Sequence, residues 1–340
     1  MTDMIKVNPK NPKKEKLKKA SKILRNGGTV AFPTETVYGL GANALSKAAV
    51  KKVYDAKGRP SDNPMIVHVG CKKQVKKLTR KIKKKQKILM DKFWPGPLTI
   101  VFEKSDIVPK VVTGGLDTVA IRMPSHPVAL KLIEYAKVPL AAPSANSSGR
   151  PSPTLAKHVK DDLYGKVDII LDGGRADIGV ESTVIDLTVS PPVLLRPGGT
   201  TFEDLKSVIK NLKLPSRKHT KNTPKSPGMK YRHYAPKAEV ILVEGKKNSV
   251  EDKINELIEK YENKKCAVIS VRKGTDYNSD LIKFIGPDTR TVARNLFGTL
   301  REMDKKGADM IFVEGVGEKD MGLAIMNRLR KSAAKTVKVK

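Results

Sequence analysis

The sequence contains few of the residues that build covalent or metal-held sites. Only two cysteines occur, Cys71 and Cys266, and the five histidines are scattered along the chain. This excludes a disulfide framework and a CxxC or zinc site, and we expect both cysteines to be ordinary reduced core residues. No Ser-His-Asp or Cys-His arrangement stands out, so the sequence does not indicate catalysis through a protein nucleophile.

Common phosphate-binding motifs and long apolar runs are missing as well. There is no GxxxxGK[ST] loop, and GVGEKDMG at 315–322 lacks the GxGxxG spacing, which argues against a Walker-type ATPase and an ordinary dinucleotide site. No apolar run approaches the roughly 18 residues of a membrane span. The first 19 residues lack the apolar centre of a signal peptide, so we expect a soluble, cytoplasmic protein without membrane contact.

Acidic residues are few compared with basic ones. The chain has 35 Asp and Glu against 67 Lys and Arg, a formal net charge of +32. A basic surface attracts nucleic-acid phosphates. However, 52 of the basic residues are lysines, and many lie on solvated helix faces such as 76–87, a pattern that heat adaptation or base-composition bias also leaves. We favour this second interpretation, so the charge alone does not identify a partner.

The length and composition predict two domains. The chain has 340 residues, of which 39% are hydrophobic, and residues 1–212 mix strands and helices in the manner of an α/β domain. Residues 213–237 contain four prolines and no apolar periodicity, which indicates a linker. Residues 238–340 alternate strand and helix, which predicts a smaller parallel-sheet domain.

Local signals place several elements in the first domain. An amphipathic helix is predicted at 15–26, ended by Gly27 and Gly28, and a second helix from a Ser46 cap to about Lys57. We expect a loop containing Gly39 and Gly41 between them, then one basic helix that ends near 94, and a later helix at 202–212.

Cations and small polar residues gather at predicted element ends. Lys57 and Arg59 close a helix and Asn63 opens the next strand, a set that suits phosphate oxygens. Cations at a helix C-terminus also oppose the macrodipole, and we favour that interpretation for the pair taken alone. His68 shares a strand face with Ile66, where a packing role is the more common one.

Other strands carry polar residues on one face or at their ends. The period of two places Thr118, Ala120 and Arg122 on one strand face, either as a surface strip or as a ligand platform whose Arg binds a carboxylate. Ser144 and Asn146 follow an apolar strand, in either a ligand loop or a plain turn. Ser182 and Arg196 lie at two further strand ends. Taken together, these residues supply fixed hydrogen-bond donors and cations but no evident nucleophile. Such a set favours a reaction at a phosphate group over hydrolysis of an amide.

Eight motifs taken in order resemble one family. They are PTETVYGLG, KGRPSDNP, WPGPLT, RMPSHP, APSANSSGRPSPT, ESTVIDL, LLRPG and SPGMKYRHYAP, between about residues 20 and 236. The chain thus resembles the YrdC-type threonylcarbamoyl-AMP synthases in their two-domain form, whose KxR…SxN signature is matched by Lys57, Arg59, Ser144 and Asn146. TVARNLF and GLAIMNRLRKSA resemble that form's second domain. The resemblance implies a twisted mixed sheet with flanking helices around an open basic cavity, plus a smaller Rossmann-like parallel α/β domain.

The resemblance also implies a reaction and a site. L-Threonine, bicarbonate or CO2, and ATP would give threonylcarbamoyl-AMP and pyrophosphate, with Mg²⁺ carried by the ATP on protein ligands that the sequence does not identify. The signature residues Lys57, Arg59, Ser144 and Asn146 would be catalytic. Threonine would contact Thr36, His68, Arg122, Ala142 and Ser182. ATP would contact Arg59, Asn63, Thr118, Ser144, Ser152, Arg196 and Tyr234, and the segment 226–236 would fold back over it as a strap.

The implied partners follow from the product. A separate transferase would move the threonylcarbamoyl group to the adenosine beside the tRNA anticodon, with at most weak direct tRNA contact, and we expect a monomer. Two alternatives stay open: a non-catalytic RNA-binding module, and another carbamoyl-adenylate-forming enzyme of the hydrogenase-maturation kind. The latter adds cysteine-rich zinc fingers, which two cysteines cannot supply.

Overall fold

The computed structural model describes residues 1–215 and 233–340, and the chain divides into two compact units. The first comprises Met1–Ser148, Ser152–Asp177 and Glu181–Lys230, and the second comprises Gly149–Pro151, Ile178–Val180 and Tyr231–Lys340. Most of the predicted linker at 213–237, and most of the predicted strap at 226–236, lie outside the described residues.

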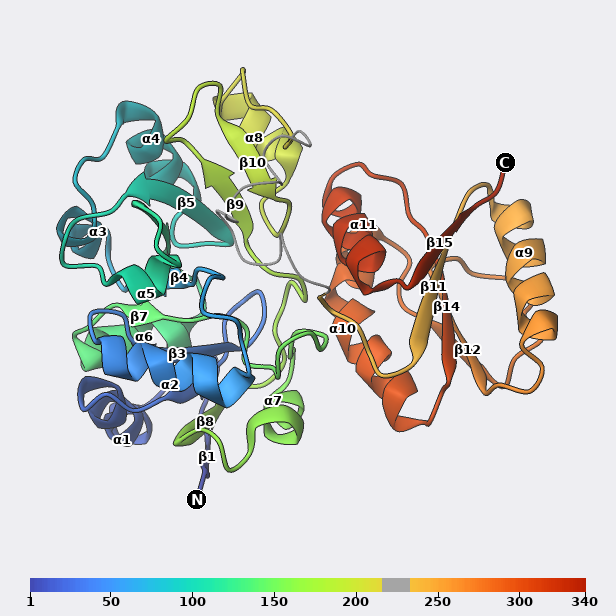
Figure 1. Ribbon diagram of the computed structural model, residues 1–340, viewed down its shortest axis with the longest axis horizontal. Coiled ribbons are helices and arrows are strands. Elements are labelled where there is room, and N and C mark those ends of the chain that lie inside the picture. Colours follow the sequence, from blue (N-terminus) through green and yellow to red (C-terminus); the bar gives the residue numbers. More distant parts are fainter. Residues whose placement is uncertain (216–232) are drawn as a thin grey trace. The chain divides into compact units, whose positions relative to one another are not determined.

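The first unit is built on a ten-stranded mixed sheet (Figure 1). Its strands are β1 (Asp3–Lys6), β2 (Val30–Phe32), β3 (Gly39–Asn43), β4 (Ile66–His68), β5 (Leu98–Glu103), β6 (Thr118–Arg122), β7 (Leu140–Ala141), β8 (Ile169–Asp172), β9 (Thr183–Asp186) and β10 (Val193–Arg196). Their order is β1-β8-β2-β3-β7-β4-β6-β5-β9-β10. Strands β4 and β6 are parallel, and β5 pairs antiparallel with β6 and parallel with β9. The predicted mixed α/β fold is confirmed.

Eight helices of the first unit flank this sheet within the described residues. They are α1 (Lys14–Arg25), α2 (Lys47–Lys57), α3 (Lys72–Leu78), α4 (Lys84–Phe93), α5 (Lys110–Thr113), α6 (Pro127–Ala136), α7 (Ala156–Leu163) and α8 (Phe202–Val208). Apolar faces of α1 and α6, including Leu17, Leu24, Leu132 and Ile133, pack with Phe32 in one buried core. The Ser46 hydroxyl caps α2 as predicted, by accepting from the Ala49 N–H.

Two helix predictions were wrong in extent. The single basic helix expected to end near residue 94 is two helices, α3 and α4, because Thr79 is extended and pairs with Lys104 beyond β5. The helix expected at 202–212 ends at Val208, since the chain beyond it returns to pair with β10 through Lys213. In both places, hydrogen bonding to a distant strand overrides the local helical pattern.

The predicted loop around Gly39 and Gly41 is instead strand β3. Gly39 pairs with Phe32, and Gly41 pairs with Val30. A Cβ on Gly41 would lie 2.7 Å from the Phe32 ring, so the glycine leaves room for that ring to cover the strand. Glycine has a low intrinsic strand propensity, and the cross-strand aromatic ring compensates for it here.

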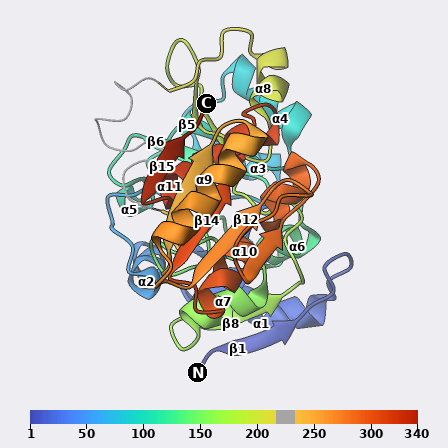
Figure 2. The ribbon, with the colours of Figure 1, turned by 90° about the vertical axis from the view of Figure 1, so that its right-hand side faces the viewer.

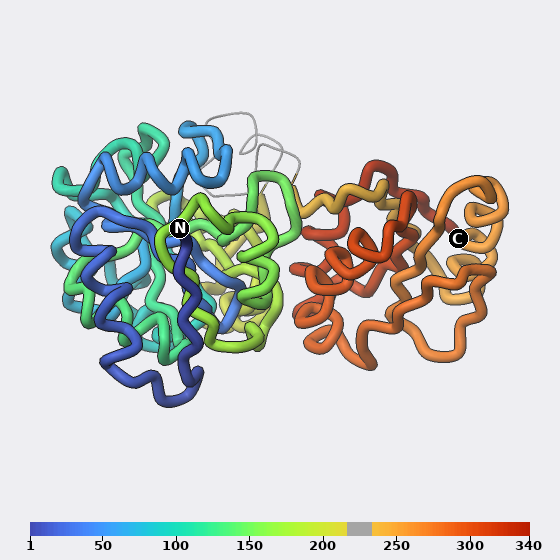
Figure 3. The backbone as a smooth tube through the Cα atoms, turned by 90° about the horizontal axis from the view of Figure 1, so that it is seen from below, coloured from blue at the N-terminus to red at the C-terminus, as the bar shows by residue number. Residues whose placement is uncertain are grey.

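The second unit is a five-stranded, fully parallel sheet with helices on both faces (Figure 2). Its elements are β11 (Glu239–Glu244), α9 (Lys247–Lys260), β12 (Cys266–Ser270), β13 (Leu281–Phe284), α10 (Thr289–Lys305), β14 (Met310–Glu314), α11 (Met321–Ser332) and β15 (Lys335–Lys338). The strand order is β13-β12-β14-β11-β15. The orange and red end of the backbone tube in Figure 3 corresponds to this unit. The parallel sheet with its flanking helices confirms the predicted Rossmann-like domain.

Neither cysteine is the core residue that we expected. Cys71 is exposed at the start of α3, and Cys266 is half-buried at the start of β12. Both thiols are free. Among the helices of the described ranges, none combines the length and the apolar character needed to cross a bilayer.

Candidate active site

Arg122 lies at the centre of a buried polar network in the first unit. It ends β6, and the sheet register places His68 of β4 and Thr99 of β5 directly beside it. Its side chain is only 4% exposed. Strand pairing therefore fixes one cation between two neighbouring strands, where its guanidinium cannot be solvated by bulk water.

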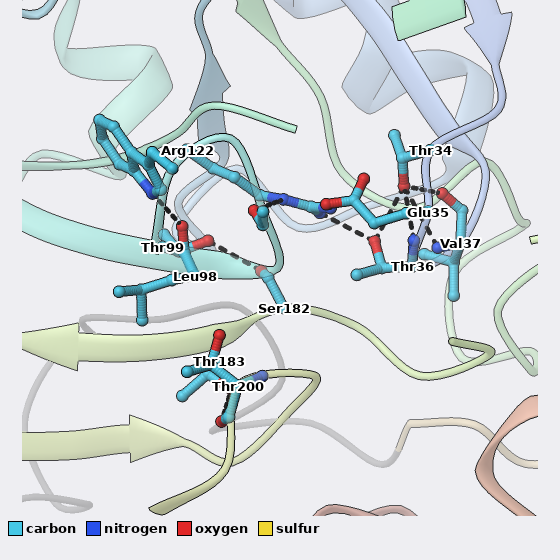
Figure 4. Close-up of polar contacts among 12 residues, drawn as sticks. Thr34, Glu35, Thr36, Val37, Leu98, Thr99, Arg122, Ser182, Thr183 and Thr200 are labelled. Atoms are coloured by element: carbon cyan, nitrogen blue, oxygen red, sulfur yellow. Dashed lines mark hydrogen bonds and ion pairs between the residues drawn. The ribbon is translucent and has the colours of Figure 1, made fainter. Parts of the chain in front are cut away.

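The Arg122 guanidinium is compensated by the PTETVYG motif. Its Nη2 lies 2.7 Å from Oε1 of Glu35, and its Nη1 donates to the Thr36 hydroxyl at 2.8 Å (Figure 4). Its Nε donates to the carbonyl oxygen of Gly96 at 3.3 Å. Two of the five guanidinium N–H groups are hydrogen-bonded, whereas Nη2 contacts Glu35 only as an ion pair and has no hydrogen-bond partner within the described residues, so N–H groups remain for a further anion. The sequence interpretation missed Glu35, although an acid between two threonines inside a quoted motif was a usable signal.

A second cluster joins Ser182 to Arg196. The Ser182 hydroxyl lies 2.8 Å from that of Thr99, the register partner of Arg122. Arg196, at the end of β10, donates from Nε and Nη2 to the Ser182 carbonyl oxygen at 3.0 and 2.9 Å. A Cβ on Gly198 would approach the Glu181 oxygen to 2.2 Å, so this turn requires glycine for the chain to come so close.

Lys57 binds the segment that carries Ser144 and Asn146. Its ammonium, buried at the end of α2, donates to the Ser144 carbonyl oxygen at 2.5 Å and to that of Asn146. The Ser144 hydroxyl donates to the Asn146 side-chain oxygen at 2.5 Å. The structure thus brings three residues of the KxR…SxN signature together. Lys57 therefore hydrogen-bonds this loop, and its position at the end of α2 is not explained by the helix dipole alone.

Backbone pairing ties the signature loop to the PTETVYG motif. Ser144 forms a bridge with Gly39, and the Ala145 N–H donates to the Tyr38 oxygen at 2.8 Å. Ala142, buried just after β7, donates its N–H to the Ile66 oxygen at 2.9 Å. Segments about a hundred residues apart in the sequence therefore meet at strands β3, β4 and β7.

Arg59 and Asn63 form a separate corner of the same unit. The Arg59 guanidinium donates to the carbonyl oxygens of Asn63 at 3.3 Å and Pro64 at 3.0 Å. Asn63 is buried, and within the described ranges its side-chain oxygen has no hydrogen-bond partner. Such an orphaned buried acceptor is costly unless something else satisfies it.

Three further predicted ATP contacts, Thr118, Ser152 and Tyr234, have surroundings of their own. Thr118 opens β6, at the end of the strand away from Arg122, about 13 Å along it. The buried Ser152 hydroxyl donates to Glu181 Oε1 at 2.5 Å. Tyr234 belongs to the second unit, where its ring stacks on Phe297 with centroids 5.2 Å apart. Its predicted part in ATP binding stays a prediction.

His68 is held neutral by its surroundings. It is 4% exposed, packs edge-on against Phe32 at 6.2 Å, and places Nδ1 3.3 Å from the Ile66 oxygen. Burial, together with the positive charge of Arg122, lowers the pKa of His68 from 6.5 to about 3. The imidazole is therefore an uncharged hydrogen-bonding group throughout the neutral range.

This lowered pKa predicts acid sensitivity. The unfolded chain binds a proton on this imidazole below pH 6.5 and the folded chain does not, so stability is lost as the pH falls from 6.5 toward 3. Between pH 7 and pH 5 we expect His68 to contribute a loss of about 2 kcal/mol. Urea unfolding of the wild type and of His68→Gln at pH 7 and at pH 5 measures this loss of stability. An equal fall in the two proteins would contradict the assignment.

The chemistry of the arrangement is that of an anion-binding site. Within residues 1–215 and 233–340, no group of three or more His, Cys, Asp or Glu side chains is arranged to hold a metal ion. Buried guanidinium and ammonium groups are fixed by backbone carbonyls, and small hydroxyls lie between them. Such a set can orient carboxylate and phosphate oxygens and stabilise developing negative charge without prior rearrangement.

Comparisons with known proteins agree with this chemistry. Residues 22–198 match the family model Sua5_yciO_yrdC, described as "Telomere recombination". Residues 200–334 match the model described as "Threonylcarbamoyl-AMP synthase, C-terminal domain".

Individual relatives cover nearly the whole chain. The threonylcarbamoyl-AMP synthase of Pyrococcus abyssi is 55% identical over 94% of this chain and 94% of its own. That of Bacillus subtilis is 48% identical over 92% of each. The crystal structure of P. abyssi Sua5 complexed with L-threonine is 52% identical, covers all of both chains and superposes with a TM-score of 0.95.

Proposed function

Because this chain belongs to the threonylcarbamoyl-AMP synthase family, we propose that it converts L-threonine, bicarbonate or CO2, and ATP into threonylcarbamoyl-AMP and pyrophosphate. One observation supports this most: the buried Arg122, whose guanidinium is fixed by Glu35 and Thr36 and retains N–H groups for a carboxylate. A relative whose structure covers all of this chain is complexed with L-threonine.

The substrates supply the nucleophile in this reaction. The deprotonated amine of threonine attacks CO2, and loss of a proton gives a carbamate. A carbamate oxygen then attacks the α-phosphorus of ATP, a P–O bond forms, and the bond to the bridging oxygen breaks to release pyrophosphate. The protein has to hold two anionic reactants in line and neutralise charge on the transferring phosphoryl group, which fixed donors accomplish.

We assign the threonine-binding site to the buried network around Arg122. The guanidinium would take the carboxylate in a two-pronged hydrogen bond, with Thr36, the neutral His68, Ser182 and the Ala142 backbone lining the rest of the amino acid. Glu35 would keep Arg122 oriented. It would also stand next to the ammonium of threonine, which must lose a proton before it can attack CO2.

We assign the phosphate and carbamate end to the signature residues. The Lys57 ammonium and the Ser144–Asn146 loop would face the transferring phosphoryl group, and Arg59, Asn63, Thr118, Ser152, Arg196 and Tyr234 would hold the rest of ATP. The orphaned Asn63 oxygen supports a polar ligand in that corner. Magnesium would enter as the ATP complex, a substrate whose phosphates provide most of the metal ligands.

The cellular setting follows from the proposed product. A carbamoyl-adenylate is a reactive mixed anhydride, so a separate transferase must consume it and move the threonylcarbamoyl group to tRNA. We propose that this takes place in the cytoplasm, where ATP and tRNA meet, that the chain acts as a monomer, and that it makes at most weak direct contact with tRNA.

Threonine-dependent release of pyrophosphate tests the function. Purified protein with ATP, magnesium and bicarbonate should release pyrophosphate when L-threonine is added and almost none without it. D-Threonine and L-alanine serve as matched controls. Absence of threonine-dependent release would falsify the synthase assignment, and tight, salt-sensitive RNA binding without nucleotide turnover would favour an RNA-binding module instead.

A further inference from the structure

The second unit has a crevice at the carboxyl edge of its parallel sheet. The ends of three adjacent strands line it: Glu244 at the end of β11 with Gly245 after it, Val271 and Arg272 after β12, and Gly315–Gly317 after β14. Its volume is about 400 Å³. We call it the carboxyl-edge crevice, and the proposed synthase reaction leaves it without a role.

The crevice lies between two neighbouring strands whose following helices pack on opposite faces of the sheet. Helix α9, which follows β11, packs Val250, Ile254 and Leu257 on one sheet face against Val243 and Phe312. Helices α10 and α11 lie on the opposite face (Figure 1). Strands β11 and β14 are neighbours. Since their connections leave to opposite faces, a gap opens beyond their carboxyl ends, which is where ligands bind in doubly wound α/β sheets.

Three glycines shape the turn from β14 into α11. A Cβ on Gly315 would lie 3.2 Å from the Glu244 side chain, and a Cβ on Gly322 would lie 1.7 Å from the Gly317 oxygen. A Cβ on Gly317 would meet nothing within 4 Å. Gly315 thus leaves room for the Glu244 side chain, Gly317 leaves an open approach for a ligand, and Gly322 lets α11 pack closely on the turn. The last two are roles of glycines in the dinucleotide fingerprint, here at GxGxxxxG spacing.

A buried carboxylate positions the cation of the crevice. Glu314 is completely buried and accepts hydrogen bonds from the Tyr277 hydroxyl at 2.5 Å, the Ser270 hydroxyl at 2.9 Å and the Arg272 N–H at 3.1 Å. It thereby fixes the turn that carries Arg272. The Arg272 guanidinium donates from Nη2 to the Gly245 oxygen at 3.3 Å, whereas its buried Nη1 makes no hydrogen bond within the described chain and lies 3.7 Å from Glu314.

The crevice also carries an anion, Glu244. Glu244, at the end of β11, accepts two hydrogen bonds of 2.9 Å from Arg330. These bonds lower the pKa of Glu244, so it stays ionised, and each of its oxygens retains a lone pair for a hydroxyl donor. The crevice therefore offers a cation, a glycine turn and an acceptor for a hydroxyl group.

We propose that the carboxyl-edge crevice binds a nucleoside monophosphate, with the phosphate against Arg272 and the Gly315–Gly317 turn and a ribose hydroxyl on Glu244. The volume of the crevice suits a mononucleotide. A guanidinium next to a glycine turn is a common phosphate-binding arrangement. This site belongs to the second unit and is independent of the ATP that the synthase reaction consumes.

Hydrogen exchange on the full chain tests the proposal, because it shows which peptides a nucleotide protects. AMP, GMP, CMP and UMP are added separately at millimolar concentration, with inorganic phosphate and adenosine as partial ligands. At least one nucleotide should slow exchange in peptides that span 243–247, 270–274 and 314–323. Binding at the proposed active site would instead protect peptides within residues 22–198, so the two sites are read separately.

Two variants and one control make the test decisive. Arg272→Ala removes the cation, and Gly317→Val fills the open position in the crevice, so each should weaken the apparent Kd by at least about tenfold. Lys273→Ala, the loss of the adjacent exposed cation, should leave it unchanged, and all three should keep threonine-dependent pyrophosphate release. No protection by any nucleotide, equal protection by inorganic phosphate, or undiminished protection in both variants would overturn the proposal.

Discussion

Replacing Arg122 with methionine should abolish threonine-dependent pyrophosphate release. Methionine keeps much of the apolar stem but offers no donor for the carboxylate of threonine. The loss of one partner from a buried charge pair costs about 2–5 kcal/mol, so we expect kcat/KM for threonine to fall on the order of 1,000-fold. Steady-state pyrophosphate release at varied threonine concentration measures it, and activity within tenfold of wild type would remove Arg122 from the site.

The same substitution also has a structural cost that has to be separated from the functional one. Without Arg122, the buried Glu35 carboxylate would lose the ion pair at 2.7 Å, which should destabilise the fold by about 3–5 kcal/mol. The double variant Arg122→Met with Glu35→Gln removes both charges and should regain most of that stability while staying inactive. A double variant that regains activity together with stability would show that Arg122 serves only the fold.

Much of the site was predictable because its residues follow strands and turns. Ser144 and Asn146 come directly after an apolar strand, and Arg122 ends another, so their places at strand ends were already evident in the sequence. The assignment to a family rested on eight motifs in order, and the comparisons confirm it. Helix α2 with its Ser46 cap was predictable for a different reason, since capping is a purely local interaction.

What the sequence did not show depends on pairing between distant segments. The burial of Arg122 became clear only once His68 and Thr99 were known to flank it. From the sequence, its strand was interpreted as either a surface strip or a ligand platform, and both interpretations place the polar face of the strand in the open. In the structure, four of the five β6 residues are buried. Strand β3 was missed because its glycines depend on the ring of Phe32. Glu35 was missed because its partner lies 87 positions further along the chain.

Lys57→Met should cause the second large loss of activity. The Lys57 ammonium is buried and donates to the carbonyl oxygens of both Ser144 and Asn146, so it holds the signature loop and carries positive charge to it. Removing one preorganised donor from a site of developing negative charge lowers kcat by about 100- to 1,000-fold. Single-turnover pyrophosphate release at saturating ATP and threonine isolates this chemical step.

A control on the same helix separates a catalytic effect from a structural one. Lys52 is exposed on α2, and its ammonium donates to one backbone oxygen, that of Gly27 at 2.9 Å, so Lys52→Met removes a lysine-to-backbone bond at the surface of the same helix. It should leave kcat unchanged. Lys57→Arg should fail like Lys57→Met, because a planar guanidinium does not reproduce a compact ammonium held between two carbonyls. Full activity in Lys57→Arg would mean that positive charge alone suffices. In that case the fixed geometry of Lys57, Ser144 and Asn146 would not be what drives the transfer.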